Sequence, residues 1–240
     1  MDAHRQLPAL PAHSICLLVN AVAADSRMSQ NLASACGKLG LTSTWIVDQS
    51  SQAKVLADSM AGFELAAAAS ARSPQRLRTE ITNLQAGLQA ISGTEVSVVA
   101  GEPHQLRSRA ALLADMGISV VVPLAPSTSE AKQPRQLPYG LWQLDPTVTL
   151  PRARTRWSLL PARRPCVAQL TSAGPSSLAA LTLSQASNSD VNSYLKLLQE
   201  VATSSRQDEI KVVTAGQMAT ALSSQNETKP QRSILSLIHI

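Results

Sequence analysis

Glu102 and His104 place a carboxylate and an imidazole two residues apart, just after a run of apolar residues. With Asp25 or Asp48, they could form a general acid–base pair, or a metal site with mixed nitrogen and oxygen ligands that would take zinc. The alternative is that all of them are ordinary loop residues. We favour this alternative, because the sequence lacks the ligand pairs at helical or turn spacing that are typical of metal sites.

The sequence contains none of the common catalytic motifs. It lacks G-x-S-x-G, the phosphate-binding G-x-x-x-x-G-K-[ST] loop, G-x-G-x-x-G and H-E-x-x-H. Of its four histidines, only His104 follows a predicted strand, so a Ser-His-Asp arrangement would depend on this one residue. Cys16, Cys36 and Cys166 form no C-x-x-C pair, which favours small core residues over disulfides or a thiolate zinc site. We therefore expect no cofactor, with zinc only in the site described above.

Positive charge is concentrated in the C-terminal part of the chain. Residues 1–150 hold 11 Lys and Arg against 11 Asp and Glu, whereas residues 151–240 hold 10 against 5. Half of these ten bases form one cluster that contains no acidic residue, namely Arg152, Arg154, Arg156, Arg163 and Arg164. Such guanidinium groups could bind a polyanion. A solvated loop explains the cluster more simply, because the chain has no signature of a nucleic-acid-binding fold, and we expect no nucleic acid partner.

The elements that would position these residues alternate along the chain. Residues 15–19, 42–47, 62–66, 95–99 and 118–122 are typical of strands, and residues 26–39, 52–60, 74–92 and 105–116 between them favour helices. The clearest helix begins at Ser73-Pro74, ends before Gly93, and repeats Leu77, Ile81, Leu84, Leu88 and Ile91 along one face, with Gln85 expected outside this stripe. Alternation of this kind predicts a parallel sheet covered by helices.

The second half of the chain continues the pattern after a predicted surface loop at residues 123–138. We expect strands at residues 141–144, 148–150, 167–170 and 210–213, and helices at residues 190–203 and 215–222. Seven or eight strand–helix steps in about 210 residues fit a small barrel. The predicted fold class is therefore α/β, with an irregular, TIM-like (β/α) barrel of seven or eight strands.

Length and composition indicate a single domain. We place it at residues 14–222, after an N-terminal extension at residues 1–13 and before a tail at residues 223–240 that is expected to be disordered or foreign to the native sequence. No apolar run reaches the roughly 18 residues of a membrane helix, so no span is predicted. Pro8 and Pro11 argue against an export signal in residues 1–24, and we expect a cytoplasmic protein. The sequence does not indicate an oligomeric state.

Several elements resemble the polysaccharide deacetylase (NodB-homology) family. I-C-L-L-V-N at residues 15–20 and S-T-W-I-V at residues 43–47 are similar to the T-F-D-D and A-T-F-F-V strands that open that family. G-F-E-L-A at residues 62–66 is similar to its G-H-E-I-G strand, and A-G-E-P-H at residues 100–104 lies over its R-P-P-Y motif. The likeness covers about residues 14–222.

The resemblance also implies a site, which this chain has lost. Active members of the family remove acetyl groups from glycans with a metal that is bound by an Asp and two His of an H-x-x-x-H motif, together with an Asp base and a late His acid. Here Asn20 stands at the position of the base and Ala21 at that of the metal-binding Asp. Ala68 and Arg72 stand at the H-x-x-x-H positions, and Gln169 lies near that of the late His. We therefore expect a catalytically inactive, deacetylase-like protein that could keep a carbohydrate-binding or structural role.

Overall fold

The computed structural model of the chain describes residues 13–59, 62–124, 133–151 and 165–227. Its strands form one sheet in the order β6-β7-β5-β4-β3-β2-β1-β9-β8. The bounds are β1 Ser14–Asn20, β2 Ser43–Val47, β3 Phe63–Ala69, β4 Val98–Gly101, β5 Val120–Pro123, β6 Arg135–Gln136, β7 Trp142–Gln143, β8 Val148–Leu150 and β9 Ser176–Thr182. A further strand, β10 (Lys211–Val213), pairs with the amino-terminal half of β1. The pairs are parallel except for β6 with β7.

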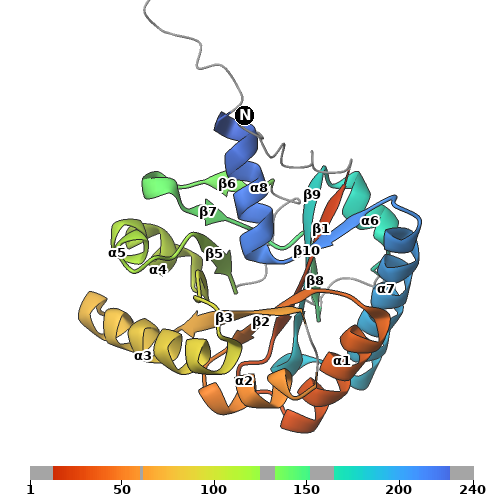
Figure 1. Cartoon of the computed structure of the whole chain (residues 1–240), viewed down its shortest axis with the longest axis horizontal. Helices are drawn as coiled ribbons and strands as arrows, with labels where there is room; N and C mark the ends of the chain where they lie inside the picture. The colour runs from red at the N-terminus through yellow and green to blue at the C-terminus, as the bar shows by residue number, and fades with distance from the viewer. Residues whose placement is uncertain (1–12, 60–61, 125–132, 152–164, 228–240) are drawn as a thin grey trace, which may run out of the picture.

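The helices lie mostly outside this curled sheet (Figure 1). Their bounds are α1 Ser26–Leu39, α2 Ser50–Ala57, α3 Pro74–Ser92, α4 Pro103–Ser108, α5 Ala110–Asp115, α6 Val167–Ser172, α7 Asn188–Arg206 and α8 Ala215–Glu227. The predicted fold class, an irregular (β/α) barrel, is confirmed. The sheet has ten strands instead of seven or eight because of short additional strands such as β6, and its order begins at β6 and ends at β8.

The ends of the helices follow local signals in the sequence. Helix α3 begins where the Ser73 side chain accepts a hydrogen bond from the N–H of Arg76, with Pro74 in its first turn. At the end of the same helix, Gly93 adopts φ +67°, a left-handed conformation that favours glycine. Helix α7 begins with a reciprocal capping box between Ser187 and Asp190. Local capping therefore fixes both ends of α3 and the start of α7.

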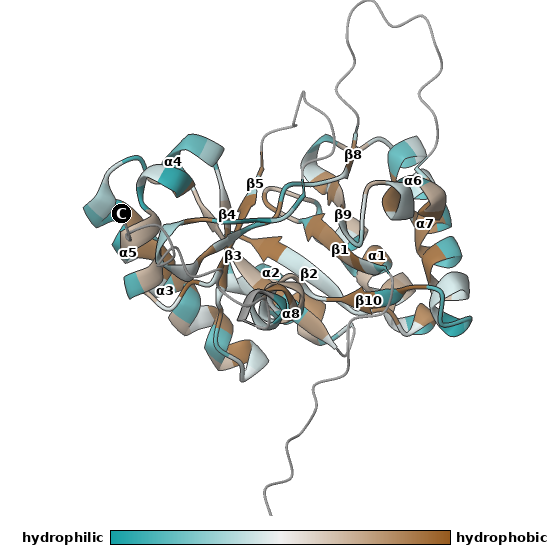
Figure 2. Ribbon diagram, turned by 90° about the horizontal axis from the view of Figure 1, so that it is seen from above, coloured by the Kyte–Doolittle hydropathy of each residue, from teal (hydrophilic) through white to brown (hydrophobic). Residues whose placement is uncertain are grey.

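Two apolar layers hold the barrel together, one on each face of the sheet. The outer layer packs residues such as Leu17 and Val99 of the strands against Leu77, Ile81 and Leu88 of α3 and against the other surrounding helices. The inner layer fills the barrel with small and branched side chains, including Leu18, Ala68 and Val122. In Figure 2 the apolar residues follow β1 and β9, whereas the outward faces of the helices are polar. Both faces of the central strands are thus buried, as expected for a parallel sheet.

Helix α8 contributes to the inner layer, unlike the other long helices. Its residues Met218 and Ala219 are buried among the inward side chains of the strands, and Leu222 packs against them. It begins beside Thr44 and Glu64, near the amino ends of β2 and β3. Figure 1 shows α8 crossing the middle of the curled sheet. The helix therefore covers the amino-terminal end of the barrel and leaves the carboxyl ends of the strands to form any site.

One predicted strand is wrong, and two strands were missed, namely β6, which lies within the predicted loop at residues 123–138, and β9. Residues 167–170 were expected as a strand, but they belong to helix α6. The strand of this region is β9, which pairs with β1 along its whole length. A segment as short as V-A-Q-L at residues 167–170 cannot be assigned by periodicity alone, and the two alanines of β9 favour a helix by intrinsic propensity. Burial between β1 and β8 overrides that propensity.

Three further details differ from the sequence-based expectation. The helix expected at residues 105–116 is divided into α4 and α5 at Arg109, which has φ −123°. Gln85 does not merely flank the apolar stripe, because its Nε2 donates to the carbonyl oxygens of Val96, at 2.9 Å, and Met116, at 3.2 Å. Helix α8 continues past the expected end at Leu222 to Glu227.

Among the helices that the structure describes, none is long and apolar enough to cross a bilayer.

Candidate functional site

The carboxyl end of β1 is the centre of the candidate site. Asn20, the last residue of this strand, is 7% exposed, and its Oδ1 accepts the backbone N–H of Val22 at 3.1 Å. Ala21 follows it and is buried, with its N–H donating to the carbonyl of Ile46 at 2.9 Å. These interactions fix the turn that leaves the strand. At this point of the barrel, Asn20 supplies a side-chain amide and Ala21 a methyl group, and neither residue supplies a carboxylate.

The carboxyl end of β3 carries the other two positions where the resemblance places metal ligands. Ala68 faces the barrel interior as part of the inner layer. Arg72 is exposed in the connection to α3, and its carbonyl oxygen accepts a hydrogen bond from the Arg109 guanidinium. The same connection is fixed by Glu80, whose carboxylate accepts hydrogen bonds from the N–H groups of Ser70 and Ala71. A methyl group and a cation therefore occupy the two positions, and neither is a ligand for a metal dication.

The residues of the possible acid–base or zinc site are spread over several elements. Asp25 is exposed, and its Oδ1 accepts the N–H of Arg27 at the start of α1. Glu102 and His104 are both exposed at the start of α4, where Glu102 accepts from the side chain of Gln105 at 2.7 Å. Across residues 13–59, 62–124, 133–151 and 165–227, no three His, Cys, Asp or Glu side chains form a group that could hold a metal ion.

Asp48 is the one member of that set with a buried, unsatisfied oxygen. It follows β2, is half-buried, and its backbone N–H donates to Oε1 of Gln52 at 3.2 Å. Its Oδ1 has no hydrogen-bond partner. Gln52 connects Asp48 to the β1 end, because its Nε2 donates to the carbonyl oxygen of Ala21 at 3.2 Å. Asp48 thus lies close to Ala21 in the hydrogen-bond network without forming an acid–base pair with His104.

Gln169 does not occupy the position that the sequence assigned to it. The assignment assumed that residues 167–170 form a strand, whereas Gln169 lies within helix α6, which precedes β9. The strand end that lies beside Asn20 is that of β9, where Thr182 pairs with Asn20. The predicted position of the late catalytic histidine is therefore wrong, and the error follows directly from the missed strand.

The five arginines of the predicted polyanion cluster lie outside the described residues. They are Arg152, Arg154, Arg156, Arg163 and Arg164, all within the segment 152–164. Polyanion binding by this segment stays a prediction.

The buried thiols offer no nucleophile. All three cysteines are free, and Cys16 and Cys36 are fully buried. Burial raises the pKa of the Cys36 thiol to about 11 and that of Cys16 further. Because the thiolate is the reactive form, both cysteines are inert at neutral pH, as expected for core residues.

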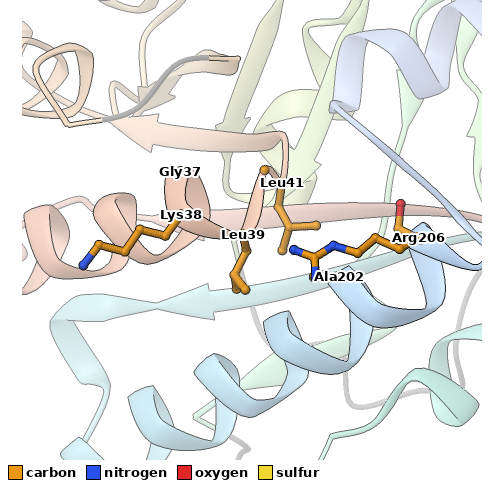
Figure 3. A pocket seen from close by; sticks show the side chains of 8 residues that line it. Gly37, Lys38, Leu39, Leu41, Ala202 and Arg206 are labelled. Carbon is orange, nitrogen blue, oxygen red and sulfur yellow. The ribbon is translucent and has the colours of Figure 1, made fainter.

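A pocket of about 430 Å³ lies away from these strand ends, between the C-termini of α1 and α7 (Figure 3). Its charged lining residues are Lys38 and Arg206, the latter extending toward Leu41, while Lys38 points away. A basic residue in the last turn of a helix is expected from the helix dipole alone. The pocket therefore gives no sign of chemistry.

One polar cluster escaped the sequence analysis. Buried Gln143 of β7 accepts hydrogen bonds from Arg107 of α4 and Arg135 of β6, and it donates to Asp145. Arg107 precedes Gln143 by 36 residues and lies on another element, so no spacing in the sequence indicates that it meets Arg135, Gln143 and Asp145. Only Asp145 carried a signal, as a carboxylate just after a predicted short strand.

Comparison with known proteins supports the fold assignment. No protein-family model and no curated protein sequence matches the chain. Among solved structures, a protein assigned as a polysaccharide deacetylase from Mycobacterium smegmatis matches with a TM-score of 0.62 at 13% identity, over 92% of this chain and 93% of that one. A mutant of the peptidoglycan deacetylase PdaC from Bacillus subtilis matches with a TM-score of 0.56 at 12% identity, over 90% and 94%.

A protein without the activity of its family also has this fold. It is a pseudoenzyme of the CE4 family from Bacillus anthracis, with a TM-score of 0.52 at 13% identity over 87% of this chain and 66% of that one. A mutant of the same protein is described as having restored enzymatic activity. At these identities the likeness establishes the fold, and the resemblance expected from the sequence is confirmed at that level.

Proposed function

We propose that this chain, which has the polysaccharide deacetylase fold, does not carry out metal-dependent deacetylation and instead binds carbohydrate. The observation that carries the proposal is the pair Asn20 and Ala21 at the carboxyl end of β1. The resemblance places a general base and a metal-binding carboxylate there. A side-chain amide is not a base at neutral pH, and a methyl group has no lone pair to donate to a metal.

The rest of the donor set does not fit zinc either. Ala68 contributes a methyl group to the inner layer of the barrel. Arg72 brings a guanidinium group, which stays protonated and would repel a dication. We therefore derive no catalytic step through a metal at this place.

The comparison with solved structures supports both halves of the proposal. A CE4 pseudoenzyme has this fold, so loss of activity is compatible with the barrel. The proteins from Mycobacterium smegmatis and Bacillus subtilis are named for polysaccharide and peptidoglycan deacetylation, which makes carbohydrate the class of ligand that we propose.

Two measurements on the purified chain test the proposal. We expect no acetate release from N-acetylated chito-oligosaccharides or peptidoglycan in the presence of zinc, and calorimetric binding of at least one of these glycans. Zinc-dependent acetate release would contradict the proposed inactivity. If the chain binds none of these glycans, the carbohydrate-binding role is contradicted.

The two other functions considered from the sequence keep less support. A rearranged hydrolase would need Glu102 and His104 to meet Asp25 or Asp48, and the described residues contain no such group. Polyanion binding by the arginines of residues 152–164 stays a prediction. It requires retention on heparin at physiological salt, and that retention should disappear when three of these arginines are changed to serine.

We also propose a cytoplasmic location. The proposal is supported by the three free cysteines and by β1, which is fully buried and pairs with β2, β9 and β10, so that residues 14–20 belong to the folded barrel. Fractionation of the source cells tests it, and recovery outside the cytoplasm would contradict it.

A further inference from the structure

Two arginine side chains converge on one buried amide oxygen at the edge of the barrel. Gln143 is 1% exposed, and its Oε1 lies 3.0 Å from Nε of Arg107 and 2.7 Å from Nη2 of Arg135. Trp142, the preceding residue, faces the inner layer, so Gln143 faces outward. Three elements therefore bring these groups together: the helix α4, the edge strand β6 and its neighbour β7.

The orientation of the Gln143 amide is fixed from its other end. Its Nε2 donates to both carboxylate oxygens of Asp145 at 2.8 Å, and Asp145 is itself buried. Because a carboxylate accepts and cannot donate, the amide must point its nitrogen toward Asp145 and its oxygen toward the arginines. Asp145 is thus a positioning residue, which acts on the arginines through Gln143.

Among the residues that the structure describes, this arrangement leaves several N–H donors of the two arginines without an acceptor. A guanidinium group has five N–H donors, and Gln143 uses one from each arginine. Within the described part of the chain, neither arginine forms an ion pair with a carboxylate. Nε of Arg135 is buried and has no hydrogen-bond partner, which is costly for a charged group. Arg107 is exposed, so the pair can be reached from solvent.

We propose that Arg107 and Arg135 bind a single oxyanion, such as a carboxylate or a phosphate group, at this edge of the barrel. Planar guanidinium groups match the two oxygens of such an anion. The anion would offset the repulsion between two cations that share one acceptor, and it would give Nε of Arg135 an acceptor. The negative charge of Asp145 reduces the net positive charge of the site. Its two carboxylate oxygens already accept from the Gln143 amide, so they do not pair with the arginines.

The oxyanion could come from free phosphate or from the carboxylate of an acidic sugar. Calorimetric titration at constant ionic strength with inorganic phosphate and with glucuronate separates the two sources. Glucose, which lacks the carboxylate, is the matched neutral sugar. Binding of either anion without binding of glucose supports the site, and the anion that binds more tightly identifies the source. These titrations need no deacetylase assay, so the site can succeed or fail independently of the proposed function.

Arginine variants locate the binding. We expect Arg107→Gln and Arg135→Gln each to weaken anion binding by at least about tenfold, since each removes charged hydrogen bonds. Arg76→Gln, at an exposed arginine on α3, is the control and should bind as the original chain does. Should Arg135→Gln fail to fold, the exposed Arg107 decides the result alone. No binding of either anion, or equal binding by the original chain and Arg107→Gln, would overturn the proposal.

Discussion

The carboxylate of Glu64 on β3 accepts the backbone N–H of Gly216 at the start of α8, with distances of 3.1 Å to Oε1 and 3.2 Å to Oε2. Thr44 of β2 completes the junction, because its hydroxyl donates to Glu64 at 2.8 Å and accepts the N–H of Ala215 at 2.9 Å. Two strands thus satisfy free N–H groups in the first turn of the helix that covers one end of the barrel.

Gly216→Ala should destabilise the chain. A Cβ at this position would clash with Oε1 of Glu64, and Glu64 cannot move away without losing its bond to Thr44. We expect a loss of about 1–3 kcal/mol in the free energy of unfolding, measured in urea. Helix propensity alone would give a gain of about 1 kcal/mol. A more stable Gly216→Ala variant would therefore show that the junction is looser than described, and Thr220→Ala, at an exposed position on the same helix, provides the baseline.

Glu64→Gln tests the charge at this junction. Burial raises the pKa of Glu64 above its usual value, and the hydrogen bonds from Thr44 and Gly216 only partly oppose this. Ionisation is therefore more costly in the folded state, and the chain loses stability as pH rises from the unfolded pKa through the raised folded pKa. Glutamine does not ionise, and its one carbonyl oxygen can accept from Thr44 and from the N–H of Gly216, both of which bond to Oε2 of Glu64. The stability of the original chain relative to Glu64→Gln should fall as pH rises from 4 to 8, and a constant or rising difference would refute the assignment.

The end of α8 is the subject of a third prediction. Nε1 of Trp142 donates to the hydroxyl of Ser223 at 2.8 Å, which is one residue beyond the domain end expected from the sequence. A chain that ends at Leu222 leaves this indole without its acceptor, at a cost of about 1–3 kcal/mol. We expect it to unfold at a lower urea concentration than a chain that ends at Glu227. Equal midpoints would mean that the contact adds nothing to stability.

Helix α3 provides a paired test of the outer layer. Leu88 is fully buried, whereas the side chain of its neighbour Gln89 is exposed. Leu88→Ala should cost about 2–5 kcal/mol through lost burial and a residual cavity. Gln89→Ala should change stability by about 0.5 kcal/mol or less. Similar losses for the two variants would indicate that the helix is rotated relative to its described position.

Local signals made much of the fold predictable. Helix α3 could be placed from Ser73, Pro74 and Gly93, because capping and conformational preferences act within a few residues. Strand β9 could not be placed, since its alanines become a strand only through pairing with β1, far away in sequence. The role of Gln85 was missed for the same reason, because its acceptors Val96 and Met116 lie on other segments.

In the candidate site, too, residues placed by local signals could be predicted from the sequence, and residues placed by tertiary contacts could not. Asn20 and Ala21 could be placed because they directly follow a strand that the sequence predicts well. Gln169 was misplaced because it depended on a strand that is a helix. The cluster around Gln143 was invisible in the sequence, because only tertiary structure brings Arg107 and Arg135 to one amide.

The most direct test of the account is a zinc titration by calorimetry, with acetate release measured on the same samples. It compares the original chain with a variant that combines Asn20→Asp, Ala21→Asp, Ala68→His and Arg72→His. We expect no stoichiometric zinc binding and no acetate release by the original chain, and zinc binding by the variant, because only the variant has ligands at these strand ends. Stoichiometric zinc binding together with acetate release by the original chain would contradict the account.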